Sequence, residues 1–197
     1  MMHHRPQQTL QRPATLSGIG FLTGADVRIR FLPAKENSGI AFQRLDLPDS
    51  PPVAARLENV ISGQRRTVIA SRGVTVMMIE HVMAALAGLQ IDNCCLVQVD
   101  AAEPPGFDGS AQPIVEALLQ AGITCQTAPR KLLRISEPAR VDGLNGQASI
   151  VARPGPQPAS LVPTSPTFQI TYALDYGPDS LVPPQKATFV ITPETFQ

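Results

Sequence analysis

The chain has 197 residues, of which 43% are hydrophobic, and its sixteen basic and sixteen acidic side chains balance. This size and composition are typical of a globular protein with one large domain or two small ones. The balanced charge and the lack of a dense basic run give no indication of nucleic-acid binding. No apolar stretch approaches the roughly twenty residues of a membrane span, and residues 1–13 lack the apolar core of a secretory signal. We therefore expect a cytoplasmic protein with no transmembrane segment and no nucleic-acid partner.

Alternating apolar and polar residues predict the first strands of the chain. Residues 27–31 and 39–45 show this alternation, and the turn residues at 37–39 predict that the two strands form a hairpin. Two further strands are expected at 54–60 and 67–70, because apolar and β-branched residues recur there between polar or glycine-containing breaks.

The strongest helix signal covers residues 79–89. Its apolar residues are spaced i, i+3, i+4 and i+7, and they are Ile79, Val82, Met83 and Leu86. Gly88 offers a left-handed end to this helix. Residues 94–99 are almost wholly apolar, as expected for a central strand that is covered on at least one face.

A second helix is predicted after a tight loop at 104–109. Ser110 can cap it and Pro113 fits its first turn, while Gly122 provides its end. The expected apolar face consists of Ile114, Val115, Leu118 and Leu119.

The three cysteines are Cys94, Cys95 and Cys125. They cannot all pair with one another, and they lack the CxxC spacing that is typical of metal sites. We expect them to be reduced thiols in the core.

Strands without helices are predicted for the last third of the chain, at 131–135, 148–152, 167–172 and 187–191. We therefore divide the chain into a polar tail (1–12), a first α+β domain (13–128) and an incomplete second α+β domain (129–197). A strand set of this length without a covering layer should expose apolar surface and favour self-association.

Glu80 and His81 at the start of the first helix are the residues most suited to chemistry. A neutral imidazole is the commonest protein metal ligand, and an adjacent carboxylate can act as a general base. A zinc site needs about three protein ligands, however, and a lone histidine on an apolar helix is more often an ordinary core or surface residue. The other histidines, His3 and His4, lie in the polar tail and are poor candidates.

Several segments in this order resemble the UDP-3-O-acyl-N-acetylglucosamine deacetylases (the LpxC family), which are zinc amidohydrolases of lipid A biosynthesis. The resemblance covers about residues 12–197 and is strongest from 75 to 123. Its most specific part is the run from Glu80 to Asn93. The segments are Thr15–Gly20, Thr23-Gly24, Glu80–Leu89, Ile91-Asp92-Asn93 and Asp108–Ala111.

The resemblance implies two similar α+β units, each a two-layer sandwich of sheet and helices (ribosomal S5 domain 2-like), with the active site between them. It implies that Glu80 is the general base and His81 the first ligand of a Zn²⁺ cofactor, with Thr23 and Gly24 at the edge of the substrate site. The implied substrate is UDP-3-O-acyl-N-acetylglucosamine, whose N-acetyl group is hydrolysed. Its acylated product implies peripheral contact with the inner membrane.

The chain departs from the family pattern in several places. The family's other zinc ligands, a histidine and an aspartate in the second unit, have no counterpart, and neither do its later histidine and its Ala-Arg-Thr-Phe segment. Residues 192–197 resemble the approach to that segment. Leu22 stands where the family usually has a histidine. The family's Ser-Thr-Val-Glu capping box is replaced by residues 77–80, Met-Met-Ile-Glu, at a cost of about 1 kcal/mol.

From these residues we expect a truncated form of a zinc-dependent deacetylase that is inactive on its own. The alternatives are a shortened non-catalytic paralogue that acts as a binding module and a structural domain without a site. Asp108 and Ser110 favour a loop that leads into a capped helix over a catalytic role. Asp92-Asn93 likewise favours a turn.

Overall fold

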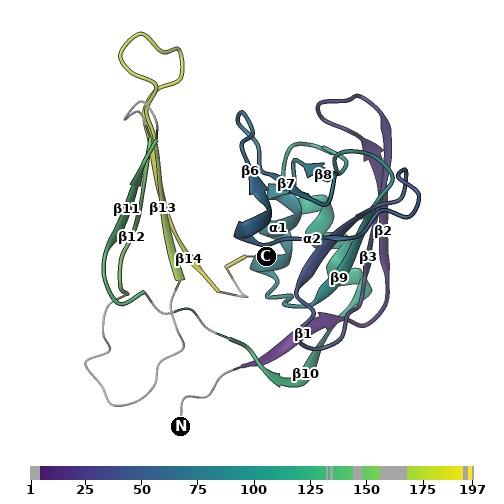
Figure 1. Ribbon diagram of the computed structural model, residues 1–197. Helices are drawn as coiled ribbons and strands as arrows, with labels where there is room; N and C mark the ends of the chain where they lie inside the picture. The colour runs from purple at the N-terminus through teal and green to yellow at the C-terminus, as the bar shows by residue number, and fades with distance from the viewer. Residues whose placement is uncertain are drawn as a thin grey trace. The chain divides into compact units, whose positions relative to one another are not determined.

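The computed structural model describes residues 5–131, 133, 135–143, 148–155, 168–192, 195 and 196 of an α+β protein with mixed sheets. The chain divides into two compact units, one ending at Arg130 and the other beginning at Lys131. The first unit contains both helices of the described residues (Figure 1). Within the described residues, no helix is long and apolar enough to cross a membrane.

The centre of the first unit is a five-stranded sheet in the order β2-β3-β9-β4-β5. Its strands are β2 (Ala14–Ile19), β3 (Asp26–Leu32), β4 (Ile40–Arg44), β5 (Val53–Ala54) and β9 (Cys94–Val99). The apolar strand β9 is central, as predicted, and runs antiparallel to β3 and parallel to β4. The expected hairpin of β3 with β4 is wrong because β9 lies between them, where its apolar side chains are covered.

One face of the sheet carries the core. Along β3, Val27, Ile29 and Phe31 are buried, whereas Arg28 and Arg30 between them are exposed. Helices α1 (Glu80–Gly88) and α2 (Gln112–Ala121) contact each other, and α2 also contacts β2 (Figure 1).

A three-stranded sheet precedes α1 and consists of β6 (Val60–Ile61), β7 (Val68–Ser71) and β8 (Val74–Met77). The single strand expected over residues 54–60 is wrong. Its place is taken by β5, a 3₁₀ turn at Leu57–Asn59 and the start of β6. The Asn59 amide donates a 2.8 Å hydrogen bond to the Ala54 carbonyl, which stabilises the turn against an extended strand.

Residues 6–10, which we expected in a polar tail, form strand β1 (Pro6–Leu10). It pairs antiparallel with β10 (Ile123–Pro129). Thr9 and Leu10 are buried. Because its partner lies more than a hundred residues later in the chain, the pairing of β1 cannot be recognised from its own residues alone.

Helix α1 forms where its apolar spacing predicts, and its start has no side-chain cap, as residues 77–80 indicate. Its end differs from the prediction. Gly88 is helical and buried, and Gln90 adopts the left-handed conformation with φ 59°. The Ile91 N–H donates to the Leu86 carbonyl (2.8 Å) and the Gln90 N–H to the Ala87 carbonyl (3.1 Å). These two bonds form a Schellman motif with glutamine in the position that glycine usually occupies.

Helix α2 ends at Gly122 and has Pro113 in its first turn as predicted, but its N-cap residue is Ala111, without a side-chain cap hydrogen bond, and not Ser110. The Gln112 N–H donates to Ser110 Oγ (3.1 Å), and Gly122 ends the helix with φ 77°. Leu119, which we expected in the buried face, is exposed, whereas Ala121 is buried. The buried face of α2 therefore consists of Ile114, Val115, Leu118 and Ala121.

The unit beginning at Lys131 contains two hairpins, and no helix is found among its described residues. β11 (Ala139–Asp142) pairs with β12 (Ser149–Ala152), and β13 (Phe168–Leu174) pairs with β14 (Gln185–Ile191). These strands confirm the predictions at 148–152, 167–172 and 187–191, apart from Thr167, which lies outside the described residues. For the predicted strand at 131–135, the described residues Lys131, Leu133 and Ile135 lie outside strands, and the other two are not described.

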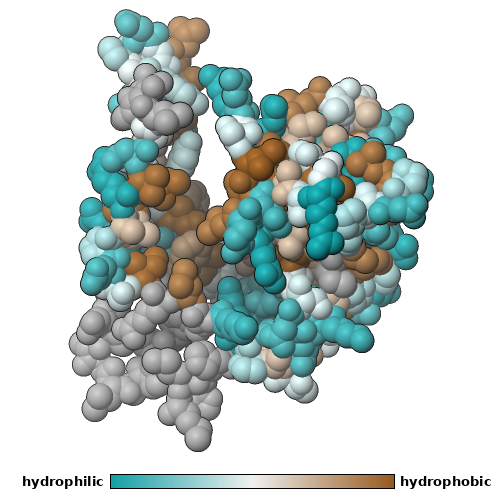
Figure 2. All heavy atoms as spheres, viewed as in Figure 1, coloured by the Kyte–Doolittle hydropathy of each residue, from teal (hydrophilic) through white to brown (hydrophobic). Residues whose placement is uncertain are grey.

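The hairpins of this unit expose apolar side chains, as expected for strands without a covering layer (Figure 2). The larger ones are Val141, Ile150, Val151, Phe168, Ile170, Tyr172, Phe189 and Val190.

The cysteines differ in their surroundings. Cys94 is buried at the start of β9, in agreement with a core thiol. Cys125 is exposed on β10, so the core prediction is wrong for this residue. The edge position of β10, which pairs only with β1, explains its exposure. The Cys95 side chain lies outside what the structure describes.

The strained end of α1 predicts that Gln90→Gly stabilises the protein by about 0.5 to 1 kcal/mol, because glycine adopts positive φ without the Cβ clash. Urea unfolding monitored by circular dichroism measures this change. The matched control is Ala87→Gly, at an exposed helical position, which should cost about 1 kcal/mol. Lower stability of Gln90→Gly would contradict the assignment of strain.

Candidate functional site

The start of α1 is positioned by strand β8 and by the segment that follows β9. The Met77 N–H, at the end of β8, donates a 3.0 Å hydrogen bond to the Ala102 carbonyl. Met78 then takes a left-handed conformation (φ 58°), which turns the chain into the helix. Ile79 is buried at the helix start. The first turn of α1, with Glu80 and His81, is therefore fixed to the core from its N-terminal side.

Glu80 is half-buried, and one of its carboxylate oxygens is held in place. Oε2 accepts a 3.1 Å hydrogen bond from the backbone N–H of Thr67, just before β7. Among the described residues, no hydrogen bond to Oε1 is seen. The carboxylate is thus oriented through one oxygen.

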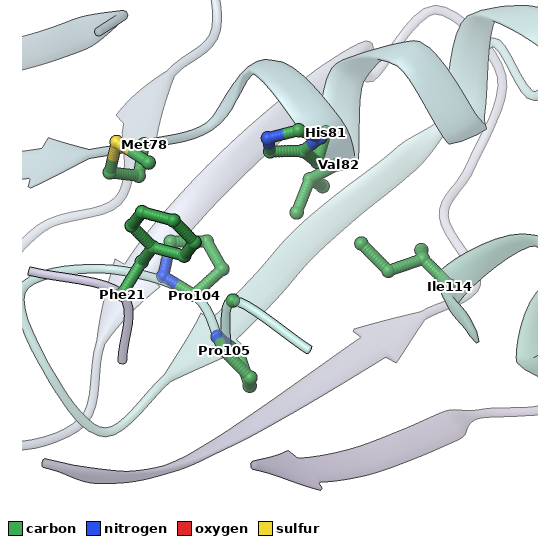
Figure 3. Close-up of a pocket in the computed structure, with 8 residues that line it drawn as sticks. Phe21, Met78, His81, Val82, Pro104, Pro105 and Ile114 are labelled. Atoms are coloured by element: carbon green, nitrogen blue, oxygen red, sulfur yellow. The ribbon is translucent and has the colours of Figure 1, made fainter. Parts of the chain in front are cut away.

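His81 lines a small pocket (Figure 3). The pocket leaves about 10 Å³ for the centre of a water molecule, which is room for roughly one water. The other residues of the pocket are apolar or glycine, and they are Phe21, Met78, Val82, Pro104, Pro105, Gly106 and Ile114. The imidazole therefore faces a confined and mostly apolar space.

Thr23 and Gly24 lie in a tight exposed loop between β2 and β3. The Gly20 N–H donates to the Ala25 carbonyl (2.8 Å), and the Gly24 N–H donates to the Gly20 carbonyl (3.0 Å). Neither Thr23 nor Gly24 lines the His81 pocket, but Phe21 of the same loop does. The loop therefore borders the pocket through its aromatic residue.

Leu22 lies in a wider surface depression next to the His81 pocket. The depression is lined by Phe21, Leu22, Gln64, Arg65, Arg66 and Met78. Phe21 and Met78 line both spaces, so the two are neighbours. Arg65 and Arg66 give the depression positive charge on one side.

Glu103 was missed by the sequence analysis and lies directly beside this loop. It is fully buried, and its Oε1 accepts hydrogen bonds from the N–H groups of Leu22 (2.9 Å) and Thr23 (2.7 Å). The only signal in the sequence is a lone acid between two alanines and the Pro104-Pro105 pair. Burial of an acidic side chain at such a site requires fixed hydrogen-bond donors.

Asn93 has a structural role. Its Oδ1 accepts the Gly39 N–H (2.9 Å), and its Nδ2 donates to the side chains of Gln7 and Gln126 (2.7 Å each). The preceding Asp92 forms a 2.8 Å ion pair with Arg5. The Asp92-Asn93 pair therefore joins distant segments of the first unit and does more than form a turn.

Asp108 organises the loop before α2. Its Oδ1 accepts hydrogen bonds from the Ser110 N–H (2.9 Å) and hydroxyl (2.8 Å). These two bonds lower the pKa of Asp108 below its ordinary value, and an electrostatic interaction with His81 contributes a smaller lowering. The observation supports the interpretation of Asp108 and Ser110 as a loop and helix start, close to the histidine.

Comparison with known proteins identifies the family. Residues 7–197 match the family described as UDP-3-O-acyl N-acetylglycosamine deacetylase, LpxC. The chain belongs to the LpxC family. The resemblance read from the sequence is therefore confirmed.

Three relatives show how much of an LpxC protein the chain covers. It is 43% identical over 148 residues to a bifunctional enzyme LpxC/FabZ of Chlorobaculum tepidum, a match of 75% of this chain and 32% of the relative. It is 36% identical over 170 residues to the UDP-3-O-acyl-N-acetylglucosamine deacetylase of Thermosynechococcus vestitus (86% and 55%). It is 42% identical over 137 residues to the deacetylase of Shewanella baltica strain OS155 (69% and 44%). The chain thus spans about a third to a half of these curated relatives.

The described part of this LpxC-family chain does not gather a complete metal site. No group of three or more histidine, cysteine, aspartate or glutamate side chains lies together among the described residues in a way that could hold a metal ion. A protein zinc site requires about three such ligands, so His81 by itself does not fit a bound zinc ion.

The hydrogen bonds to Asp108 predict a measurable titration. Ser110→Ala removes the hydroxyl donor but keeps the backbone N–H, so the pKa of Asp108 should rise toward its ordinary value of about 3.9. Because the folded-state pKa of Asp108 is lowered, its contribution to stability is present above the ordinary pKa and is lost as pH falls through the lowered value.

Carbon-detected NMR titration of the Asp108 carboxyl measures this pKa, and the exposed Asp179, whose neighbourhood is unchanged, serves as the control. An Asp108 pKa that is the same in both proteins would contradict a contribution from the hydroxyl.

Proposed function

We propose that this chain is the part of a zinc-dependent deacetylase that supplies a general base, Glu80, and one zinc ligand, His81. The proposed reaction is the hydrolysis of the N-acetyl group of UDP-3-O-acyl-N-acetylglucosamine in lipid A biosynthesis. It releases acetate and leaves a free 2-amino group. The observation that carries the proposal is the adjacent Glu80 and His81 in the first turn of α1, one held by a backbone N–H and the other facing a pocket.

In this proposal Glu80 accepts the proton of the attacking water. The Thr67 N–H holds Oε2, so the carboxylate keeps its direction while Oε1 takes up the proton. The apolar lining of the adjacent pocket limits the number of competing waters and strengthens polar interactions inside it. A bound Zn²⁺ would polarise the amide carbonyl and acidify the water, but the described residues hold too few ligands for it. The remaining ligands must therefore come from outside the described residues.

We place Thr23 and Gly24 at the edge of the substrate site. Both belong to the loop whose Phe21 lines the His81 pocket and whose Leu22 lines the adjoining depression. Arg65 and Arg66 on the other side of that depression suit an anionic substrate such as a nucleotide sugar.

The proposal includes the remaining properties that the family resemblance implies. These are a two-layer, ribosomal S5 domain 2-like fold of the first unit, a second similar unit, a location in the cytoplasm, and peripheral contact with the inner membrane through the acylated product. The division into residues 13–128 and 129–197 is part of it. The arrangement of one exposed and one helix-covered sheet face in the first unit supports the two-layer fold.

A second candidate function is a non-catalytic binding module. It is favoured by Leu22, which stands where the family usually has a histidine, and by the lack of a three-ligand group among the described residues. Such a protein would bind a nucleotide sugar at the same loop without turnover.

A chimera separates the two functions. Residues 1–197 are joined to the C-terminal remainder of the Thermosynechococcus vestitus deacetylase, and acetate release and zinc content are measured. We expect activity and stoichiometric zinc. Glu80→Gln should lower kcat by about 10²-fold or more with zinc retained, and His81→Ala should remove the zinc.

The matched control is Glu58→Gln, an exposed glutamate of the 3₁₀ turn, which should leave kcat unchanged. Thermal melting establishes that each chimera is folded. A folded, zinc-binding chimera whose activity is the same with and without the Glu80→Gln substitution would refute the role of the general base. A folded chimera that binds UDP-N-acetylglucosamine without turnover would favour the binding module.

A further inference from the structure

The buried carboxylate of Glu103 stands apart from the other acidic groups of the described residues. It is fully buried, and none of the described ion pairs includes it. Its described hydrogen bonds come from the backbone N–H groups of Leu22 and Thr23, about eighty residues away in the sequence. An acidic group buried in this way is costly unless those donors are held in place.

The loop on the other side of these hydrogen bonds fits closely around the carboxylate. A Cβ atom on Gly20 would lie 2.7 Å from Glu103 Oε1 and 2.6 Å from Thr23 Oγ1. Because Gly20 has no side chain, the loop can lie directly against the Glu103 carboxylate. The Gly24 N–H to Gly20 carbonyl bond completes the turn.

The segment after Glu103 is joined to the same loop. The Gly106 N–H donates to the Ile19 carbonyl (2.8 Å), and Gly20 forms a β-bridge with Pro105. Phe21 packs on Gly106, where a Cβ would lie 2.8 Å from its ring. Residues 103–106 and 19–23 thus form one unit that carries Phe21, Pro104 and Pro105 into the lining of the His81 pocket (Figure 3).

We propose that Glu103 is a positioning residue: its carboxylate fixes the backbone of Leu22 and Thr23, so that Phe21 covers one side of the His81 pocket. The proposal deepens the proposed function at the same site, and it rests on that function only for the chemistry of His81. The geometry of the loop stands on the hydrogen bonds alone.

The test is Glu103→Gln in the full chain. Glutamine keeps the size of the side chain but places an NH₂ group beside the loop N–H groups and removes the charge from the hydrogen bonds. We expect amide exchange of Leu22 and Thr23 to accelerate about tenfold, while Val97 in the central strand is unchanged. Modification of His81 by diethyl pyrocarbonate, followed by mass spectrometry, should become several-fold faster, since Phe21 no longer covers it.

Two further variants keep the test decisive. Gly20→Ala should give the same local changes without altering the carboxylate, and it decides the matter if Glu103→Gln does not fold. Glu116→Gln, on the exposed side of α2, is the control and should change neither readout.

Unchanged exchange of Leu22 and Thr23, or unchanged reactivity of His81 in a folded variant, would overturn the proposal. Equal acceleration at Val97 would also overturn it, because it would show a general loss of stability. Neither readout uses zinc or turnover, so an inactive chimera refutes the proposed function and leaves this result standing.

Discussion

The buried amide of Asn93 is the interaction on which the first unit depends. It lies between the end of α1 and the central strand β9, and it uses both its oxygen and its nitrogen. Its oxygen holds the Gly39 backbone before β4, and its nitrogen holds Gln7 of β1 and Gln126 of β10. Because a buried amide without partners is costly, these four segments must come together in one arrangement. The junction thereby joins β1 and β10 to the segments that lead into β4 and β9.

Strand β9 connects the Asn93 junction to the candidate site. β9 runs from Asn93 through the middle of the sheet and leads to Glu103, whose carboxylate holds the loop after β2. Ala102, next to it, accepts the N–H of Met77, where β8 turns into the first turn of α1. The segment that follows β9 therefore helps to position Glu80 and His81. The proposed chemistry uses two residues, but their positions depend on polar contacts elsewhere in the unit.

The local features of this fold could be predicted from the sequence, whereas the pairing of its strands could not. The spacing of Ile79, Val82 and Leu86 predicts α1, and Pro113 and Gly122 predict the two ends of α2, because these signals lie within or next to one helix. The hairpin expected between β3 and β4 is wrong because β9, some fifty residues later, lies between them. Strand β1 was missed for the same reason, since its partner β10 lies more than a hundred residues away.

The candidate site shows the same division. Glu80 and His81 could be found because they are adjacent in a recognisable run, and their role remains a proposal. Glu103 could not be found, because its function depends on the N–H groups of Leu22 and Thr23, which no local pattern connects to it. The left-handed end of α1 was predicted at Gly88 and lies at Gln90, because glycine is the residue usually found in this position.

We propose that the described residues bring one candidate zinc ligand, His81, to the site, and that ligands outside them complete it. Elemental analysis of the purified 197-residue chain after dialysis, beside its His81→Ala variant, tests it most directly. We expect zinc far below one ion per chain in both proteins. Stoichiometric zinc that disappears with His81→Ala would contradict it, because the chain would then hold a complete site of its own.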